Sequence, residues 1–82
     1  MVLKYLTSHE VETRPGELPE KTFRDQWIFI GGITYASIYY DQSCESVVAA
    51  LEFESQPPIK VCISHEAYLL NDNGKTIEKV RV

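Results

Sequence analysis

The chain has 82 residues and a mass of 9.4 kDa, and its eight Lys and Arg against twelve Asp and Glu give a net charge of −4. A chain of this length predicts a single domain over residues 1–82 and excludes a large α/β enzyme scaffold with a deep cofactor cleft. The acidic balance disfavours attraction to phosphate backbones and anionic lipids. We therefore expect neither direct nucleic-acid binding nor membrane binding.

Targeting signals and cysteine usage indicate the compartment. The segment Met1 to Glu10 lacks the basic start and the apolar stretch of about 7–15 residues that a secretory signal needs. The longest uncharged run, residues 26–40, is shorter than the about 20 residues of a membrane helix. Cys44 and Cys62 form no CxxC pair and are few for a small exported scaffold. We expect a cytoplasmic protein with reduced thiols.

The N-terminal quarter predicts one strand and one loop. Residues 2–7 favour a β-strand, and their alternation continues toward Val11. Residues 13–20 contain two prolines and a glycine, so they cannot supply continuous backbone hydrogen bonds and are predicted to form a loop.

The segment around Gly31-Gly32 fits two structures. In one, the two glycines form a type I′ hairpin turn that pairs Ile30 with Ile33, because both central positions of such a turn need a positive φ. In the other, residues 19–30 form a helix that Gly31 caps. The run Trp-Ile-Phe-Ile has poor helix propensity and favours the hairpin. Residues 33–40, rich in aromatic and β-branched side chains, form a strand in both interpretations.

Residues 43–54 are equally ambiguous. Apolar residues recur at helical spacing from Cys44 to Leu51, and they alternate at strand spacing from Val47 to Phe53. The pattern leaves helix and strand open.

The C-terminal third predicts three strands. Ile59, Val61 and Ile63 alternate with polar residues, which is typical of a strand with one buried face. Asn73-Gly74 is a strong hairpin signal. The predicted hairpin register places Asp72 opposite Lys75, Leu70 opposite Ile77, and Glu66 opposite Arg81.

Together these segments predict an α+β fold. We expect a small, twisted antiparallel sheet of about four or five strands with one or two helices, ending in the hairpin at Asn73-Gly74.

No motif indicates catalysis or metal binding. Cys62-x-x-His65 is the only closely spaced pair of metal-ligand types, and residues three apart on a strand point to opposite faces, so buried thiols and surface imidazoles are expected instead. Ser64-His65-Glu66 contains triad residue types, but adjacent strand residues diverge. No Gly-rich phosphate loop is present. We predict a non-enzymatic protein without catalytic residues, cofactor or metal.

Aromatic and acidic residues indicate a binding surface. Six of the nine aromatic residues fall between positions 23 and 40, and Trp and Tyr are enriched at binding hot spots. Residues 41–56 contain four acidic residues and no basic one, which favours a basic partner. The predicted protein-binding residues are Trp27, Tyr35, Tyr39, Tyr40, Asp41, Glu45, Glu52 and Glu54.

Three short segments resemble the uracil-DNA glycosylase inhibitors, small phage proteins that block a host enzyme: Leu18-Pro19-Glu20, Tyr40-Asp41-Gln42-Ser43 and the hairpin around Asn73-Gly74. The resemblance implies a protein that imitates DNA. The chain departs from the family's pattern because Lys21 and Arg24 replace expected carboxylates and Arg14-Pro15-Gly16 replaces an inserting strand. The net charge of −4 is also far less negative than DNA mimicry needs.

The leading functional hypothesis is a small cytoplasmic protein that binds another protein, as a phage-type inhibitor acting against the host or its defences, or as an accessory subunit. A basic nucleic-acid-binding enzyme is one expected partner, and self-association through an edge strand is a variant. The alternative is a small-molecule or nucleotide-binding β module that uses the aromatic rings as a pocket wall and His65 or Arg24 as polar contacts. A uracil-DNA glycosylase inhibitor-like DNA mimic is a weaker alternative.

Overall fold

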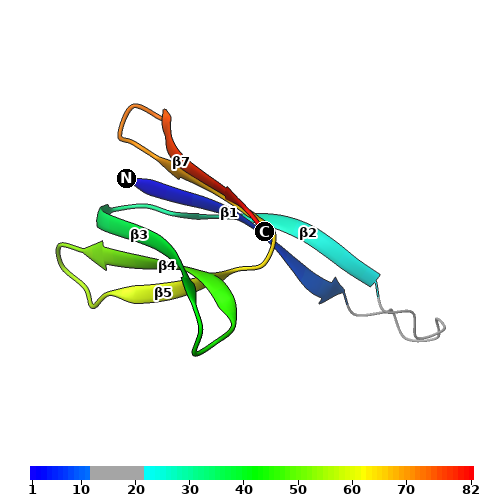
Figure 1. Ribbon diagram of the computed structural model, residues 1–82. Helices are drawn as coiled ribbons and strands as arrows, with labels where there is room; N and C mark the ends of the chain where they lie inside the picture. Colours follow the sequence, from blue (N-terminus) through cyan, green and yellow to red (C-terminus); the bar gives the residue numbers. More distant parts are fainter. Residues whose placement is uncertain (12–21) are drawn as a thin grey trace.

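The computed structural model describes residues 1–11 and 22–82, and every regular element among them is a β-strand (Figure 1). The predicted α+β class with one or two helices is therefore wrong, and the predicted loop over residues 13–20 lies outside the described residues. The seven strands are β1 (Val2–Val11), β2 (Thr22–Ile30), β3 (Ile33–Asp41), β4 (Ser46–Phe53), β5 (Ile59–Ile63), β6 (Glu66–Leu70) and β7 (Thr76–Arg81).

The two segments whose patterns fit both helix and strand contain strands β2 and β4, because their backbones pair with those of neighbouring strands. Strand β2 pairs along its whole length with β1, and β4 lies between β3 and β5. In β4, Ala49 and Leu51 point into the core and are fully buried, Glu52 is exposed, and Val48 is buried on the opposite face. Tertiary pairing thus decided between helix and strand for residues 43–54, where the local pattern left both open, and agreed with the strand that helix propensity favoured before Gly31.

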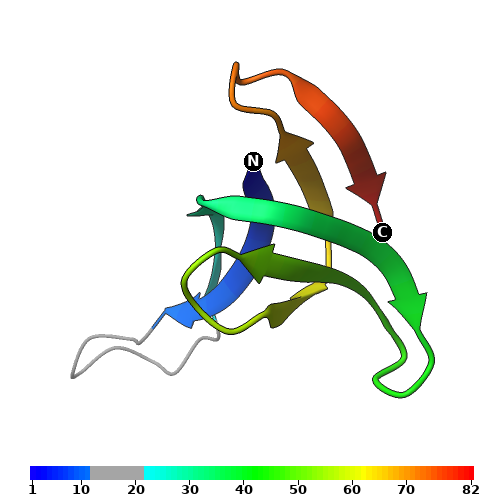
Figure 2. The ribbon, with the colours of Figure 1, turned by 90° about the vertical axis from the view of Figure 1, so that its left-hand side faces the viewer.

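The strands form two antiparallel sheets, seen as two layers in Figure 2. Sheet A has the order β2-β1-β6-β7, and sheet B has the order β3-β4-β5. Their inner faces share a hydrophobic core, and no polar or charged residue of the described chain is buried with it. The buried residues of this core are Leu3 and Ala67 from sheet A with Ile33, Ala49, Leu51 and Ile63 from sheet B.

The two glycines form a corner between the sheets. Strands β2 and β3 pair with β1 and β4 and not with each other, so the predicted pairing of Ile30 with Ile33 is wrong. Instead the ladder between β1 and β2 continues beyond the glycines, because the Ile33 nitrogen donates to the Met1 carbonyl oxygen at 3.2 Å and the Met1 nitrogen donates to the Ile33 carbonyl oxygen at 2.9 Å. The chain bends at the glycines and passes from sheet A into sheet B.

The backbone angles agree with a corner. Gly32 has a φ of +73°, whereas Gly31 has no positive φ. A type I′ turn needs a positive φ at both central residues. The hairpin prediction failed because two glycines permit a bend as readily as a reversal.

Strands β6 and β7 form the hairpin expected around Asn73-Gly74. Glu66 pairs with Arg81 as predicted, but the loop register differs, because Asn71 bonds through its backbone to both Lys75 and Gly74. Gly74 has a φ of +80°, as expected of the left-handed residue that ends such a loop. Next to this loop a bulge pairs Leu70 with Thr76, and the predicted pair with Ile77 is not formed.

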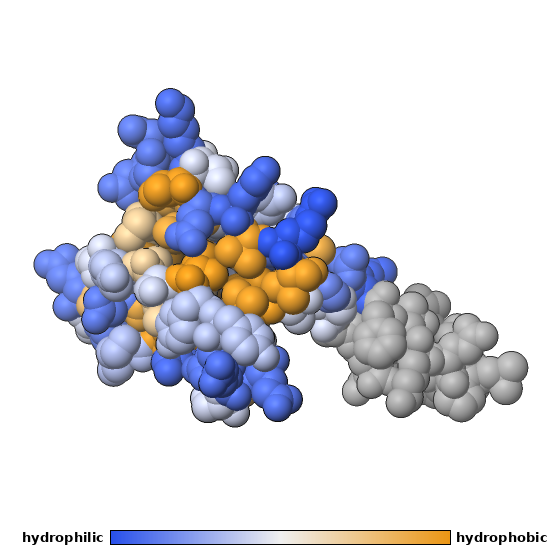
Figure 3. Space-filling view, in the orientation of Figure 1, coloured by the Kyte–Doolittle hydropathy of each residue, from blue (hydrophilic) through white to orange (hydrophobic). Residues whose placement is uncertain are grey.

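One side of the molecule is open between the sheets. Strands β7 and β3 are free edges of sheets A and B, and apolar side chains reach the surface between the two layers (Figure 3). Among residues 1–11 and 22–82, the structure contains no helix with the length and hydropathy needed to cross a membrane.

The corner predicts different effects for the two glycines. Gly32→Ala should destabilise the fold by about 1–2 kcal/mol, because a side chain is strained in the left-handed region. Gly31→Ala should leave stability unchanged or raise it by up to about 1 kcal/mol, because its Cβ would meet only the Val2 Cγ2 atom, at 4.0 Å. Urea unfolding followed by circular dichroism measures both, and equal destabilisation would instead indicate a type I′ turn.

Candidate functional site

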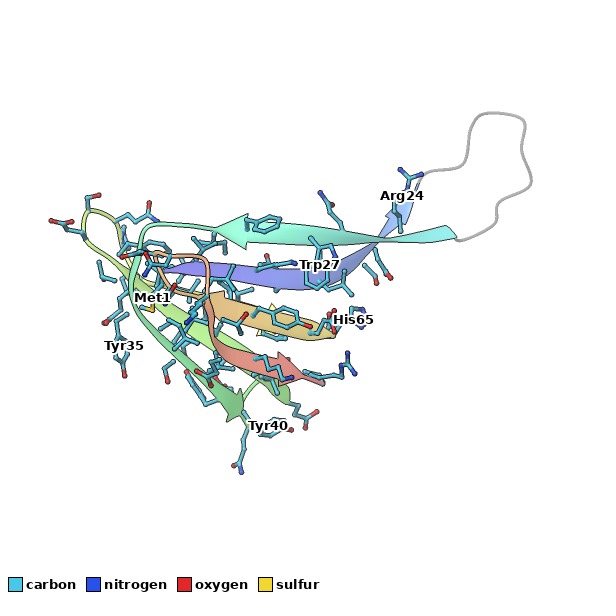
Figure 4. All side chains as sticks on the ribbon, turned by 90° about the horizontal axis from the view of Figure 1, so that it is seen from above. Met1, Arg24, Trp27, Tyr35, Tyr40 and His65 are labelled. Atoms are coloured by element: carbon cyan, nitrogen blue, oxygen red, sulfur yellow. The ribbon has the colours of Figure 1, made fainter. Side chains whose placement is uncertain are left out.

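The predicted binding residues lie on both sheets and do not form one surface. Trp27 is on the outer face of sheet A, whereas Tyr35 is on the outer face of sheet B, and Figure 4 shows them on different sides of the molecule. Tyr39 shares the outer face of sheet B with Tyr35, while Tyr40, as the next residue of β3, points to the opposite face. The structure therefore separates Trp27 from the tyrosines of β3.

The four acidic residues also divide into two groups. Asp41 and Glu45 lie at the turn between β3 and β4, whereas Glu52 and Glu54 lie at the far end of β4. Along a strand with a rise of about 3.3 Å per residue, the groups are roughly 20 Å apart. The acidity of residues 41–56 is thus two separate sites and not one continuous face.

Tyr35 stands beside a pocket on sheet B. A β-bulge follows Ile33 and turns Tyr35 outward, where its residue is 59% exposed and pairs with Glu52. The adjacent pocket has a volume of about 250 Å³. Its lining residues are Tyr35, Ala50, Leu51, Glu52, Pro58, Ile59 and Lys60. An exposed aromatic ring, an apolar pocket and a carboxylate therefore meet at this point of sheet B.

A polar cluster lies at the other end of the same face. The Asp41 carboxylate accepts hydrogen bonds from the Ser43 hydroxyl at 2.6 Å and the Ser43 backbone nitrogen at 2.9 Å. These bonds, and the Lys60 ammonium 3.8 Å away, hold the pKa of Asp41 below its usual value of 3.8. A hydrogen bond and an electrostatic interaction with Tyr39, followed by the nearby Asp41 charge, raise the pKa of Lys60 above its usual value of 10.5. Lys60 thereby offsets the charge of Asp41 on this face.

Sheet A carries a row of residues that sequence reasoning missed. Four residues lie opposite one another across its four strands, with Phe29 paired to Lys4, Lys4 to Tyr68, and Tyr68 to Lys79. We call Phe29, Lys4, Tyr68 and Lys79 the cross-strand row. It alternates aromatic and cationic side chains on the outer face of the sheet, the face seen in Figure 4.

Trp27 joins this row through ring contacts. The Lys4 Nζ atom lies 4.5 Å from the centroid of the Trp27 ring and 5.7 Å from that of Tyr68. The two ring centroids are 6.0 Å apart with an interplanar angle of 44°. Lys4 is thus held by cation–π attraction to two rings.

The row had one weak sequence signal. Phe29 and Trp27 are two residues apart, and this spacing on a strand places them on one face. Lys4, Tyr68 and Lys79 are distant in the sequence, and only the pairing of β1, β6 and β7 brings them beside Phe29.

A serine, a histidine and an aspartate meet beside this face but lack the order that nucleophilic catalysis needs. The Ser8 hydroxyl donates to Asp25 Oδ1 at 2.8 Å and lies 3.1 Å from His65 Nε2. With the hydroxyl proton directed to the aspartate, the 3.1 Å contact is a hydrogen bond only in the imidazole form that carries a proton on Nε2. In a catalytic triad the histidine lies between the other two residues.

No metal site that includes the cysteines is present among the residues that the structure describes. Cys44 and Cys62 are both free thiols and both exposed, so the expectation of buried thiols is wrong. Within residues 1–11 and 22–82, no three His, Cys, Asp or Glu side chains are grouped closely enough to hold a metal ion.

Comparison with known proteins found no match to a protein-family model, a curated protein or a solved structure.

The Asp41 cluster predicts a specific pKa change. Ser43→Ala should raise the pKa of the Asp41 carboxyl toward 3.8, because it removes the hydrogen bond that lowers the pKa most. The folded protein binds the Asp41 proton more weakly than the unfolded chain, so Asp41 adds stability above pH 3.8 and this contribution is lost as the pH falls through its folded pKa. Carbon-detected NMR titration of the carboxyl measures the shift.

Two further variants serve as controls. Ser55→Ala changes an exposed serine away from Asp41 and should leave its pKa unchanged. Lys60→Met removes the cation and should raise the pKa less than Ser43→Ala does, because the serine bonds have the larger effect. An unchanged pKa in Ser43→Ala contradicts the assignment.

Proposed function

We propose that this is a small non-enzymatic protein that binds another protein through the outer face of sheet B, as an inhibitor or an accessory subunit. The observation that carries the proposal is the position of Tyr35, which is 59% exposed beside an apolar pocket of about 250 Å³. Tyrosine is enriched at the few positions that dominate interface energies, where large rings exclude water from polar neighbours.

The surroundings of Tyr35 favour a partner with a basic residue near an apolar side chain. Glu52 of β4 lies directly opposite Tyr35 of β3, and Glu54 follows directly after the end of β4. An apolar side chain of the partner would fill the pocket, and its basic group would pair with Glu52. A basic nucleic-acid-binding enzyme is one class of protein with such surfaces.

We place this activity in the cytoplasm. Both cysteines are exposed and unpaired, and exposed thiols persist in a reducing compartment. The DNA-mimic alternative has less support for two reasons. The acidic residues of segment 41–56 form two separate groups, and the positive charge of Lys60 offsets the negative charge of Asp41.

Capture of the partner tests the proposal. Immobilised wild-type protein should retain a stoichiometric partner from a lysate of the cell in which it acts. Tyr35→Ala should weaken the complex at least about 30-fold, because truncating a central aromatic residue typically costs about 2 kcal/mol or more. Glu52→Lys should also weaken it, and titration calorimetry with the purified partner measures both changes.

Matched controls lie on strand β7. Ile77→Ala removes a comparably exposed apolar side chain, and Glu78→Lys makes the same charge change on sheet A. Both should bind like the wild-type protein. Equal affinity of Tyr35→Ala and Ile77→Ala, or isolation from the lysate without any stoichiometric partner, contradicts the proposal.

A further inference from the structure

We propose that the outer face of sheet A binds single-stranded nucleic acid, with bases stacked on the aromatic rings of the cross-strand row and phosphates held by Lys4, Lys79 and Arg81. The surface is separate from the one proposed for protein binding, because it belongs to the other sheet. The two proposals can therefore fail independently.

The arrangement of the row matches the chemistry of a single strand. Phe29, Lys4, Tyr68 and Lys79 follow one another on four adjacent strands. A nucleotide chain likewise alternates a flat apolar base with an anionic phosphate. Proteins that bind single strands without sequence preference combine stacking rings with cations that follow the backbone.

The rings of this face are available to a ligand. Phe29 is 62% exposed, and among the described residues its ring forms no pair with another aromatic ring. Trp27 and Tyr68 are half-buried, and their mutual contact together with Lys4 fixes their orientation. A preorganised ring loses little conformational freedom when a base stacks on it.

Two of the three cations of this face line one pocket. Lys79 and Arg81 line a pocket of about 260 Å³ together with Tyr68 and Val80. Arg81 donates to Glu66 at 3.3 Å, whereas Lys4 and Lys79 form no ion pair among the described residues. Two ammonium groups that have no carboxylate partner within residues 1–11 and 22–82 where side chains are described, next to aromatic rings, favour an anionic ligand that also stacks.

The net charge of the chain does not describe this face. On it Arg81 is paired with Glu66, whereas Lys4 and Lys79 form no ion pair among the described residues, and the four acidic residues of segment 41–56 lie with sheet B. The expectation that nucleic acid is not bound directly came from the charge summed over the whole chain. The fold separates the charges, so local complementarity gives the opposite inference.

A single strand fits better than the other anionic ligands. Three strand spacings of about 4.8 Å separate Phe29 from Lys79, so the row is roughly 14 Å long, a distance that an oligonucleotide crosses more readily than a single nucleotide. The bases of a duplex are already stacked and cannot reach the rings. An acidic peptide would use the cations but would leave Phe29 without a stacking partner.

The experiment uses the full chain and a fluorescein-labelled oligothymidylate of about 16 nucleotides, the upper site size for a small β domain. Fluorescence anisotropy should show saturable binding at low salt. Trp27 is the only tryptophan, so quenching of its emission should report stacking at this face directly. For each tenfold increase in salt concentration, the logarithm of the association constant should fall by about 0.7 per phosphate contact.

Variants then separate rings from cations. Phe29→Ala should weaken binding by about 5- to 150-fold, because one stacked base is lost. Lys79→Ala should weaken binding less than Phe29→Ala does. It should also reduce the slope of the logarithm of the association constant against the logarithm of salt concentration by about 0.7. Tyr35→Ala removes a matched exposed tyrosine from sheet B and should bind like the wild-type protein. Circular dichroism confirms that each variant is folded, and both altered side chains of sheet A are exposed.

Several results would overturn the inference. Absence of both anisotropy change and Trp27 quenching at low salt is one. Equal affinity for a duplex of the same length shows phosphate attraction without stacking. Equal competition by polyglutamate indicates a surface for acidic proteins. Wild-type affinity of folded Phe29→Ala shows that the rings do not contribute.

Discussion

The bend at Gly31-Gly32 is the constraint on which the rest of the fold depends. The chain from β2 to β3 stays paired with β1 as far as Ile33, then turns into the second sheet. Gly32 permits the turn because it adopts a φ of +73° without a side-chain clash. Because of the bend, β2 belongs to sheet A and the next strand, β3, belongs to sheet B. The core residues are buried because the two sheets then face each other.

The same bend gives the protein two outer faces with different chemistry. Trp27 and Phe29 precede the glycines and face solvent from sheet A, whereas Tyr35 and Tyr39 follow them and face solvent from sheet B. An aromatic segment that is continuous in sequence is therefore divided between opposite surfaces. Each surface acquires its own charged neighbours, with Lys4 beside Trp27 and Phe29 on sheet A, and with Glu52 opposite Tyr35 and Lys60 beside Tyr39 on sheet B.

The strands with clear alternation or strong turn signals were predictable. Residues 59–63 and the hairpin that pairs Glu66 with Arg81 follow from local pattern, because alternation and an Asn-Gly turn act over a few residues. For residues 22–30 the sequence favoured a strand but gave the wrong partner, and for residues 46–53 it left helix and strand open. The hydrophobic residues of 46–53 satisfy both helix and strand periodicity, and only hydrogen bonding to β3 and β5 distinguishes the two.

The sequence by itself determined the size of the chain, its terminal hairpin, the enrichment of aromatic residues before Asp41 and the acidity after Tyr40. It did not determine which of these residues share a surface. The tertiary structure alone placed Lys4, Tyr68 and Lys79 beside Phe29, and it separated Trp27 from Tyr35. The physical reason is that a surface is assembled by pairing between strands that are remote in the chain, whereas composition and periodicity describe only neighbours along it.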